Sequence, residues 1–189
     1  MSQFRSRRKG GVHVELPQHA GALLNNLARQ LVELLSEGEP QERVGGDPLE
    51  ELLDFGAPRD RPADPALQRL LPDGHRDDDV ASAEFRRFTE ATLRQSKIHD
   101  ATVVVSCLDG LAAEEVEGDL EFELDAVQAR CWMRCLTDLR LALATRLDIQ
   151  TGEADGWENL AEDDERLPLF EIYDWLGYLL ESLVDSVRH

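Results

Sequence analysis

The sequence is short of several features that would assign it to a familiar class of protein. It has three cysteines in 189 residues, too few for the disulfide scaffold of a small secreted domain. It contains no stretch of about 18 apolar residues, so we expect no transmembrane helix and no membrane partner. Its basic first residues lack the apolar run of a secretory signal. We therefore expect a cytoplasmic protein with reduced thiols.

Positive charge is also scarce. Lysine and arginine total 20 against 39 aspartates and glutamates, which gives a formal net charge of -19. A field of this sign repels phosphates, so we expect no direct binding of nucleic acid. It suits a basic protein partner, although solubility alone is usually the better explanation for such an acidic protein.

The motifs of common enzyme classes are missing. The sequence has no P-loop, no dinucleotide-binding glycine pattern, no nucleophile elbow and no zinc-protease motif. The histidines (13, 19, 75, 99 and 189) show no metal-ligand spacing, and His99 with Asp100 reads as an ordinary surface pair. We therefore expect no enzyme activity, no cofactor and no metal.

The patterning predicts a mainly α-helical, single-domain bundle with a small N-terminal β-hairpin. Residues 1–16 form the hairpin: Val12, Val14 and Leu16 alternate with polar residues, and a glycine pair at 10–11 suits the turn. This arm is basic at positions 5 and 7–9. A phosphate-binding role is one interpretation, and a solvated strand is the more common one.

Residues 17–189 form the predicted helical domain. Helices are expected from 17 to about 38, from 80 to 96, from 125 to 147 and from 168 to 187. The second continues or restarts through 98–111, although the β-branched run at 103–105 would also suit a strand. Ala81, Phe85, Phe88 and Leu93 supply much of its apolar face. A flexible acidic connection covers about 38–79, with short helices at 48–55 and 65–71. Residues 120–124 alternate as a short extended piece.

The most distinctive chemical feature is a pair of cysteines, Cys131 and Cys135, on the third long helix. Residues four apart share a helix face, with Cβ atoms roughly 5–6 Å apart, whereas a disulfide needs Cβ atoms roughly 3.5–4.5 Å apart. Linking the thiols would therefore deform the helix. Arg130 and Arg134 flank them and could lower a thiol pKa. From spacing alone, two such cysteines are more often core residues than a switch.

Four stretches of the sequence resemble a known family. They are residues 83–90 (AEFRRFTE), 93–97 (LRQSK), 137–147 (TDLRLALATRL) and 173–176 (YDWL). Together they resemble the AosR-like family of actinobacterial oxidative-stress regulators, long catalogued as a domain of unknown function, over most of the chain. The resemblance implies a redox-sensing transcriptional regulator that works with a sigma factor or another RNA polymerase component. It also implies that Cys131 and Cys135 are the redox-active pair.

Two hypotheses follow from the sequence. The first is a cytoplasmic redox sensor in which a Cys131–Cys135 disulfide changes a surface that binds a protein partner. The second is a redox-independent acidic helical adaptor that binds a basic partner. Either is compatible with a homodimer.

Overall fold

The computed structural model describes residues 3–7, 11–37, 60–75, 77–112, 118–149 and 163–188. Within these ranges the chain forms, in order, the strands and helices β1 (Gln3–Ser6), β2 (Val12–Leu16), α1 (Gln18–Ser36), α3 (Pro65–Leu70), α4 (Asp79–Ala112), β3 (Leu120–Leu124), α5 (Ala126–Arg146) and α6 (Leu167–Arg188). The predicted mainly helical fold with a small N-terminal β-hairpin is confirmed.

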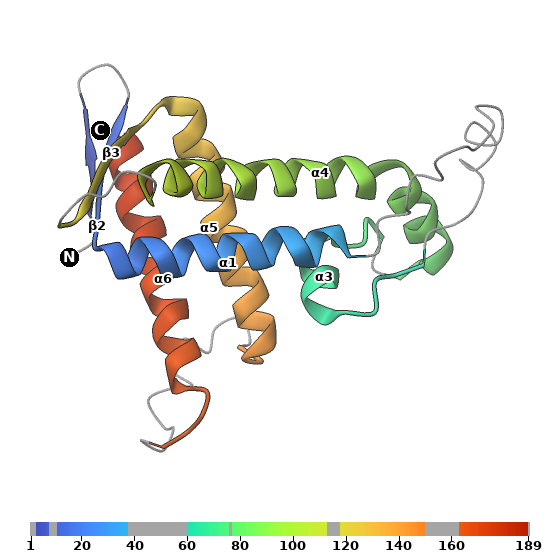
Figure 1. Cartoon of the computed structure of the whole chain (residues 1–189). Coiled ribbons are helices and arrows are strands. Elements are labelled where there is room, and N and C mark those ends of the chain that lie inside the picture. Colours follow the sequence, from blue (N-terminus) through green and yellow to red (C-terminus); the bar gives the residue numbers. More distant parts are fainter. Residues whose placement is uncertain are drawn as a thin grey trace.

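The long helices are arranged as two crossed pairs. α1 and α4 run side by side, and α5 and α6 cross them, as Figure 1 shows. α5 contacts both α4 and α6, so it occupies the centre of the bundle. The sheet lies at the end of the bundle where α1 begins and α4 ends (Figure 1). No described helix combines the length and the apolarity needed to cross a membrane.

The N-terminal hairpin is extended by a third strand. β1 pairs antiparallel with β2, and β2 pairs antiparallel with β3, which gives the order β1-β2-β3. The predicted alternation is present, because Val12, Val14 and Leu16 are all buried. Two arginines of the basic arm form ion pairs on the sheet, Arg5 with Glu15 at 3.5 Å and Arg7 with Glu123 at 3.6 Å. The extended piece at 120–124 therefore joins the hairpin in one sheet.

The core is centred on an indole. Trp132 of α5 is completely buried. Its ring lies 6.2 Å from that of Phe4 in β1 and 5.6 Å from that of Phe122 in β3, measured between ring centroids. Aromatic pairs in this distance range stabilise beyond the area they bury. One side chain thus connects the central helix to both outer strands of the sheet.

The first half of α4 departs from the sequence-based expectation. Its apolar residues are turned outward: Phe88 is 61% exposed and Val80 is 80% exposed. Phe85 and Leu93, assigned to the apolar face, are exposed as well. The buried stripe is polar instead and consists of Ser82, Arg86, Glu90 and Arg94, each four residues from the next.

Hydrogen bonds explain this inverted stripe. Arg94 donates to the carbonyl of Leu35 at 2.5 Å and to that of Glu37 at 3.1 Å, and it pairs with Glu90 at 2.8 Å. Those carbonyls belong to the end of α1, where backbone acceptors lack helical partners. Arg86 pairs with Asp73. Polar groups that have hydrogen-bonding partners can be buried without the full desolvation cost. The partners of its polar residues, rather than the pattern of its apolar residues, therefore decide which face of α4 is buried.

Most predicted helix boundaries agree with the structure. The short helix expected at 65–71 is α3, and Asp64 caps it by accepting from the amide of Ala66 at 2.7 Å. The region from 80 to 111 is a single continuous helix, so the strand considered at 103–105 is absent. The first turns of α4 bend away from the direction of its longer remaining part (Figure 1). The short helix expected at 48–55, and most of the connection at 38–79, lie outside the described residues.

Replacing Trp132 by alanine should lower the free energy of unfolding by about 3–5 kcal/mol, the range for a large aromatic truncated in a packed core. Val127, in the first turn of the same helix, is 58% exposed, and Val127→Ala should change stability by less than about 0.5 kcal/mol. Urea denaturation of both variants measures the contrast. Equal losses would contradict the central position of the indole.

Candidate functional site

The start of α5 determines where the two cysteines point. Asp125 accepts hydrogen bonds from the amides of Val127 at 2.7 Å and Gln128 at 2.8 Å. The side chain of Gln128 accepts in return from the Asp125 amide at 2.9 Å. This is the capping box predicted from the sequence. The capping box holds the first turn of α5 in place, and the buried Trp132 determines how α5 is rotated about its own axis.

Cys131 and Cys135 lie on the buried face of this helix. Each is 1% exposed, and both are free thiols. α5 is continuous from Ala126 to Arg146, so the thiols are one helical turn apart on one face, as the spacing predicts. Their environments differ: Cys135 belongs to the hydrophobic core cluster, whereas Cys131 lies beside an ion pair.

That ion pair joins α5 to α4. The guanidinium of Arg134 donates to Asp100 through Nε at 2.6 Å and through Nη2 at 2.7 Å. The same Nη2 lies 3.5 Å from the sulfur of Cys131. Asp100 is 2% exposed, while the side chain of Arg134 is 53% exposed. The carboxylate is therefore inside the protein and the guanidinium is at its edge.

The environment keeps both thiols protonated. Burial raises the pKa of Cys131, and the hydrogen bond to Asp100 and the charge of Asp100 raise it further. Arg134 acts in the opposite direction and is outweighed. Burial strongly raises the pKa of Cys135, with smaller contributions from Asp138 and Asp100. Arg134 thus lowers the pKa of Cys131, as expected of a flanking arginine, but burial and Asp100 raise that pKa by more.

The two arginines named from the sequence separate in the structure. Arg134 touches both Asp100 and Cys131, as described above. Arg130 is exposed on the other side of the helix turn. Only Arg134, of the two, is brought to the thiols by a hydrogen bond within the described residues.

Sequence reasoning missed the buried carboxylates of this site. The pairing of His99 with Asp100 was expected at the surface, and for Asp100 this is wrong. Burial tends to raise the pKa of Asp100, but the hydrogen bonds from Arg134 and Cys131 outweigh it, so the pKa is lowered. The position is predictable in retrospect, because Asp100 precedes Ala101 and Val104 on the buried face of α4.

A second buried ion pair lies beside Cys135. Asp138 is 4% exposed and accepts from the Lys97 ammonium at 2.6 Å. Burial raises the pKa of Asp138, and Lys97 opposes that effect. The contact between α4 and α5 thus contains two carboxylates, two cations and two thiols.

Cys107 is separate from this cluster. It is half-buried in α4, and Gln128 donates to its sulfur at 3.8 Å. Burial raises the pKa of its thiol, and the Trp132 side chain opposes this effect. Its pKa is therefore shifted in the same direction as those of the other two thiols.

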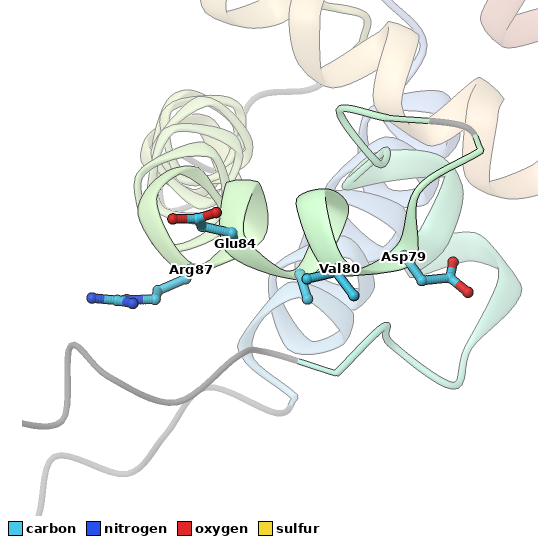
Figure 2. A pocket seen from close by; sticks show the side chains of 5 residues that line it. Asp79, Val80, Glu84 and Arg87 are labelled. Carbon is cyan, nitrogen blue, oxygen red and sulfur yellow. The ribbon is translucent and has the colours of Figure 1, made fainter.

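A pocket of about 360 Å³ lies elsewhere, on the outer side of the first turns of α4. Its lining residues are Asp79, Val80, Ala83, Glu84 and Arg87. Figure 2 shows that the side chains of Asp79, Glu84 and Arg87 point in different directions. Ligand sites need convergent polar groups, which these do not provide. Across the described ranges, no group of histidines, cysteines and carboxylates could hold a metal ion.

Comparison with known proteins gives one family. A family model described as a domain of unknown function (DUF2017) matches residues 1–187. No curated protein sequence and no solved structure matches the chain.

The burial of the thiols predicts slow labelling. At pH 7 iodoacetamide should modify each cysteine of the folded protein more slowly than in urea, since a raised pKa lowers the fraction of reactive thiolate and burial restricts access to it. Mass spectrometry of quenched samples gives the three rates, and Cys135 should be the slowest. A Cys131 that reacts equally fast in folded and unfolded protein would contradict this description.

Proposed function

The chain belongs to the DUF2017 family, and from that premise we propose that it is a redox-responsive regulator that controls transcription through a protein partner. The observation that carries the proposal is the pair of free thiols, Cys131 and Cys135, one turn apart on the face of α5 that packs against the rest of the bundle. No other pair among the three cysteines is close in sequence.

The chemistry is a two-electron oxidation. Hydrogen peroxide accepts two electrons and two protons from the two thiols, its O–O bond breaks, one S–S bond forms, and two waters leave. The disulfide needs Cβ atoms about 3.5–4.5 Å apart, closer than the roughly 5–6 Å of an ideal helix at this spacing. Forming the bond therefore requires α5 to tighten or unwind at 131–135.

Such a distortion would reach other elements directly. Trp132 lies between the cysteines in sequence and packs on β1 and β3. Arg134 also lies between them and holds Asp100 of α4. A change in this turn would alter the contacts of α5 with the sheet and with α4 together. Coupling of a local covalent change to a repacking of elements is how redox switches act.

The partner is inferred from charge and from resemblance. A net charge of -19 opposes binding to nucleic acid and favours a basic protein surface. The resemblance of residues 83–90, 93–97, 137–147 and 173–176 to the AosR-like regulators makes a sigma factor or another RNA polymerase component the partner that we propose. The setting is then the cytoplasm, where oxidant bursts are transient.

A second candidate is a redox-independent acidic adaptor. The raised pKa values of Cys131 and Cys135 and their near-complete burial favour it. In this case the cysteines are core residues, and the acidic surface alone binds the partner. The two candidates differ in whether the thiols can be linked while the protein is folded.

Disulfide mapping distinguishes them. Trypsin cleaves after Arg130, Arg134 and Arg140, so it places Cys131 on peptide 131–134 and Cys135 on peptide 135–140. After treatment of the folded protein with hydrogen peroxide or diamide, we expect these two peptides to be joined by a disulfide, and to separate on reduction. If Cys107 is oxidised while the two peptides stay unlinked, the switch is wrong and the adaptor stands.

The consequence for binding needs a matched variant. The double change Cys131→Ser, Cys135→Ser keeps side-chain size and removes the oxidisable pair. Binding to purified sigma factors of the same organism should change with oxidation in the wild type and remain constant in the variant. Equal binding by the wild type in both redox states would instead support the adaptor.

A further inference from the structure

The ion pair between Asp100 and Arg134 lies beside the thiol of Cys131. Arg134 donates two hydrogen bonds to Asp100, through Nε at 2.6 Å and through Nη2 at 2.7 Å, and the same Nη2 lies 3.5 Å from the Cys131 sulfur. The Asp100 carboxylate also raises the pKa of this thiol. Carboxylate, guanidinium and thiol therefore lie together as a triangle at the contact between α4 and α5.

Each member of the triangle has a separate effect on the sulfur. The Asp100 carboxylate repels a thiolate, so it favours the protonated form. The guanidinium of Arg134 attracts a thiolate. The charge of the neighbouring His99 contributes to lowering the pKa of Asp100. In the resting arrangement burial and Asp100 prevail, and the pKa of Cys131 is raised.

Access to the sulfur is also asymmetric. Cys131 is 1% exposed although Arg134, which touches it, is half exposed. A long side chain at the protein surface is thus in direct contact with the buried sulfur. Cys135 instead lies within the hydrophobic cluster, beside Asp138.

We propose that Asp100 and Arg134 act as a latch over Cys131, so that release of this ion pair exposes Cys131 as the thiol attacked first, while Cys135 resolves the product. The proposal rests on the redox function proposed above and specifies its order of events. Asp100 is a positioning residue in this scheme, because it acts through Arg134 and through the thiol proton.

The steps balance in atoms and electrons. The Cys131 thiol loses its proton, and the thiolate attacks one oxygen of hydrogen peroxide. The O–O bond breaks, the leaving hydroxide takes up a proton to become water, and Cys131 becomes a sulfenic acid. The sulfur of Cys135 then attacks the Cys131 sulfur and the S–O bond breaks. The hydroxide that leaves takes the Cys135 proton as the second water, and the disulfide is formed.

The test uses two substitutions with opposite expected effects. In Asp100→Asn the thiolate keeps Arg134 and loses the repelling carboxylate, so the pH midpoint for iodoacetamide labelling of Cys131 should fall. At pH 7 the rate should rise about tenfold for each unit of that fall. In Arg134→Gln the carboxylate is left uncompensated, so the midpoint should rise, but the labelling rate well above the midpoint, where the thiol is fully ionised, should increase because the latch is gone. Site-resolved mass spectrometry across pH gives both midpoints.

Two controls separate the latch from a loosened fold. Arg130→Gln removes an exposed arginine next to Cys131, and Asp138→Asn removes the buried carboxylate beside Cys135. Both should leave the Cys131 midpoint unchanged. General loosening would speed the labelling of all three cysteines and would not move the midpoints of Asp100→Asn and Arg134→Gln in opposite directions. Shifts of the same sign, or no shifts, would overturn the latch.

Trapping of the intermediate tests the order of attack. With peroxide and dimedone, Cys135→Ser should accumulate a sulfenic-acid adduct on Cys131, whereas Cys131→Ser should give several-fold less adduct on Cys135. The reverse pattern would overturn the order. Disulfide mapping of the wild type keeps the two proposals distinguishable: opposite midpoint shifts without any 131–135 disulfide would leave the latch over Cys131 standing, but would remove the resolving role of Cys135 and the switch.

Discussion

The position of α5 is the constraint on which the rest of the molecule depends. This helix is packed between α4 and α6 and against the sheet, and the burial of Trp132 among aromatic rings fixes its rotation. Once that rotation is set, Cys131, Cys135 and Asp138 must point inward and Arg130 must point outward. The thiol site is therefore a consequence of core packing, because the side chain that organises the core lies within the same helical turn as the cysteines.

The contact between α4 and α5 is unusual in its chemistry. Two nearly fully buried carboxylates, Asp100 and Asp138, are each matched by a cation that reaches them from the edge of the protein. Buried ion pairs contribute little net stability, because desolvation offsets their attraction, but removal of one partner is costly. This arrangement makes the contact specific in geometry and sensitive to the loss of a single charge. A hydrophobic contact of the same area would tolerate small shifts, whereas this one does not.

The sequence predicted the elements better than the faces they bury. Helix boundaries, the capping box at Asp125 and the alternation of Val12, Val14 and Leu16 are local properties, and they appear in the structure as expected. The buried stripe of Arg86, Glu90 and Arg94 was not predictable from periodicity, because its partners are a distant carboxylate and carbonyl groups at the end of α1. The same holds for the thiols: their shared face followed from spacing, but the pKa direction of Cys131 depends on Asp100, a residue 31 positions away in the sequence.

The hydrogen bonds of Arg94 have a mechanical consequence. They anchor the first half of α4 to the last carbonyls of α1 at defined positions. Sliding of α4 along its axis by one helical turn, about 5.4 Å, would strand a buried guanidinium. Near its other end α4 is joined to α1 again, because Asp109 accepts hydrogen bonds from Asn25 at 2.7 Å and from Arg29 at 2.5 Å. The two helices are therefore held in register at two separate points, and Asp100 lies on the stretch of α4 between them.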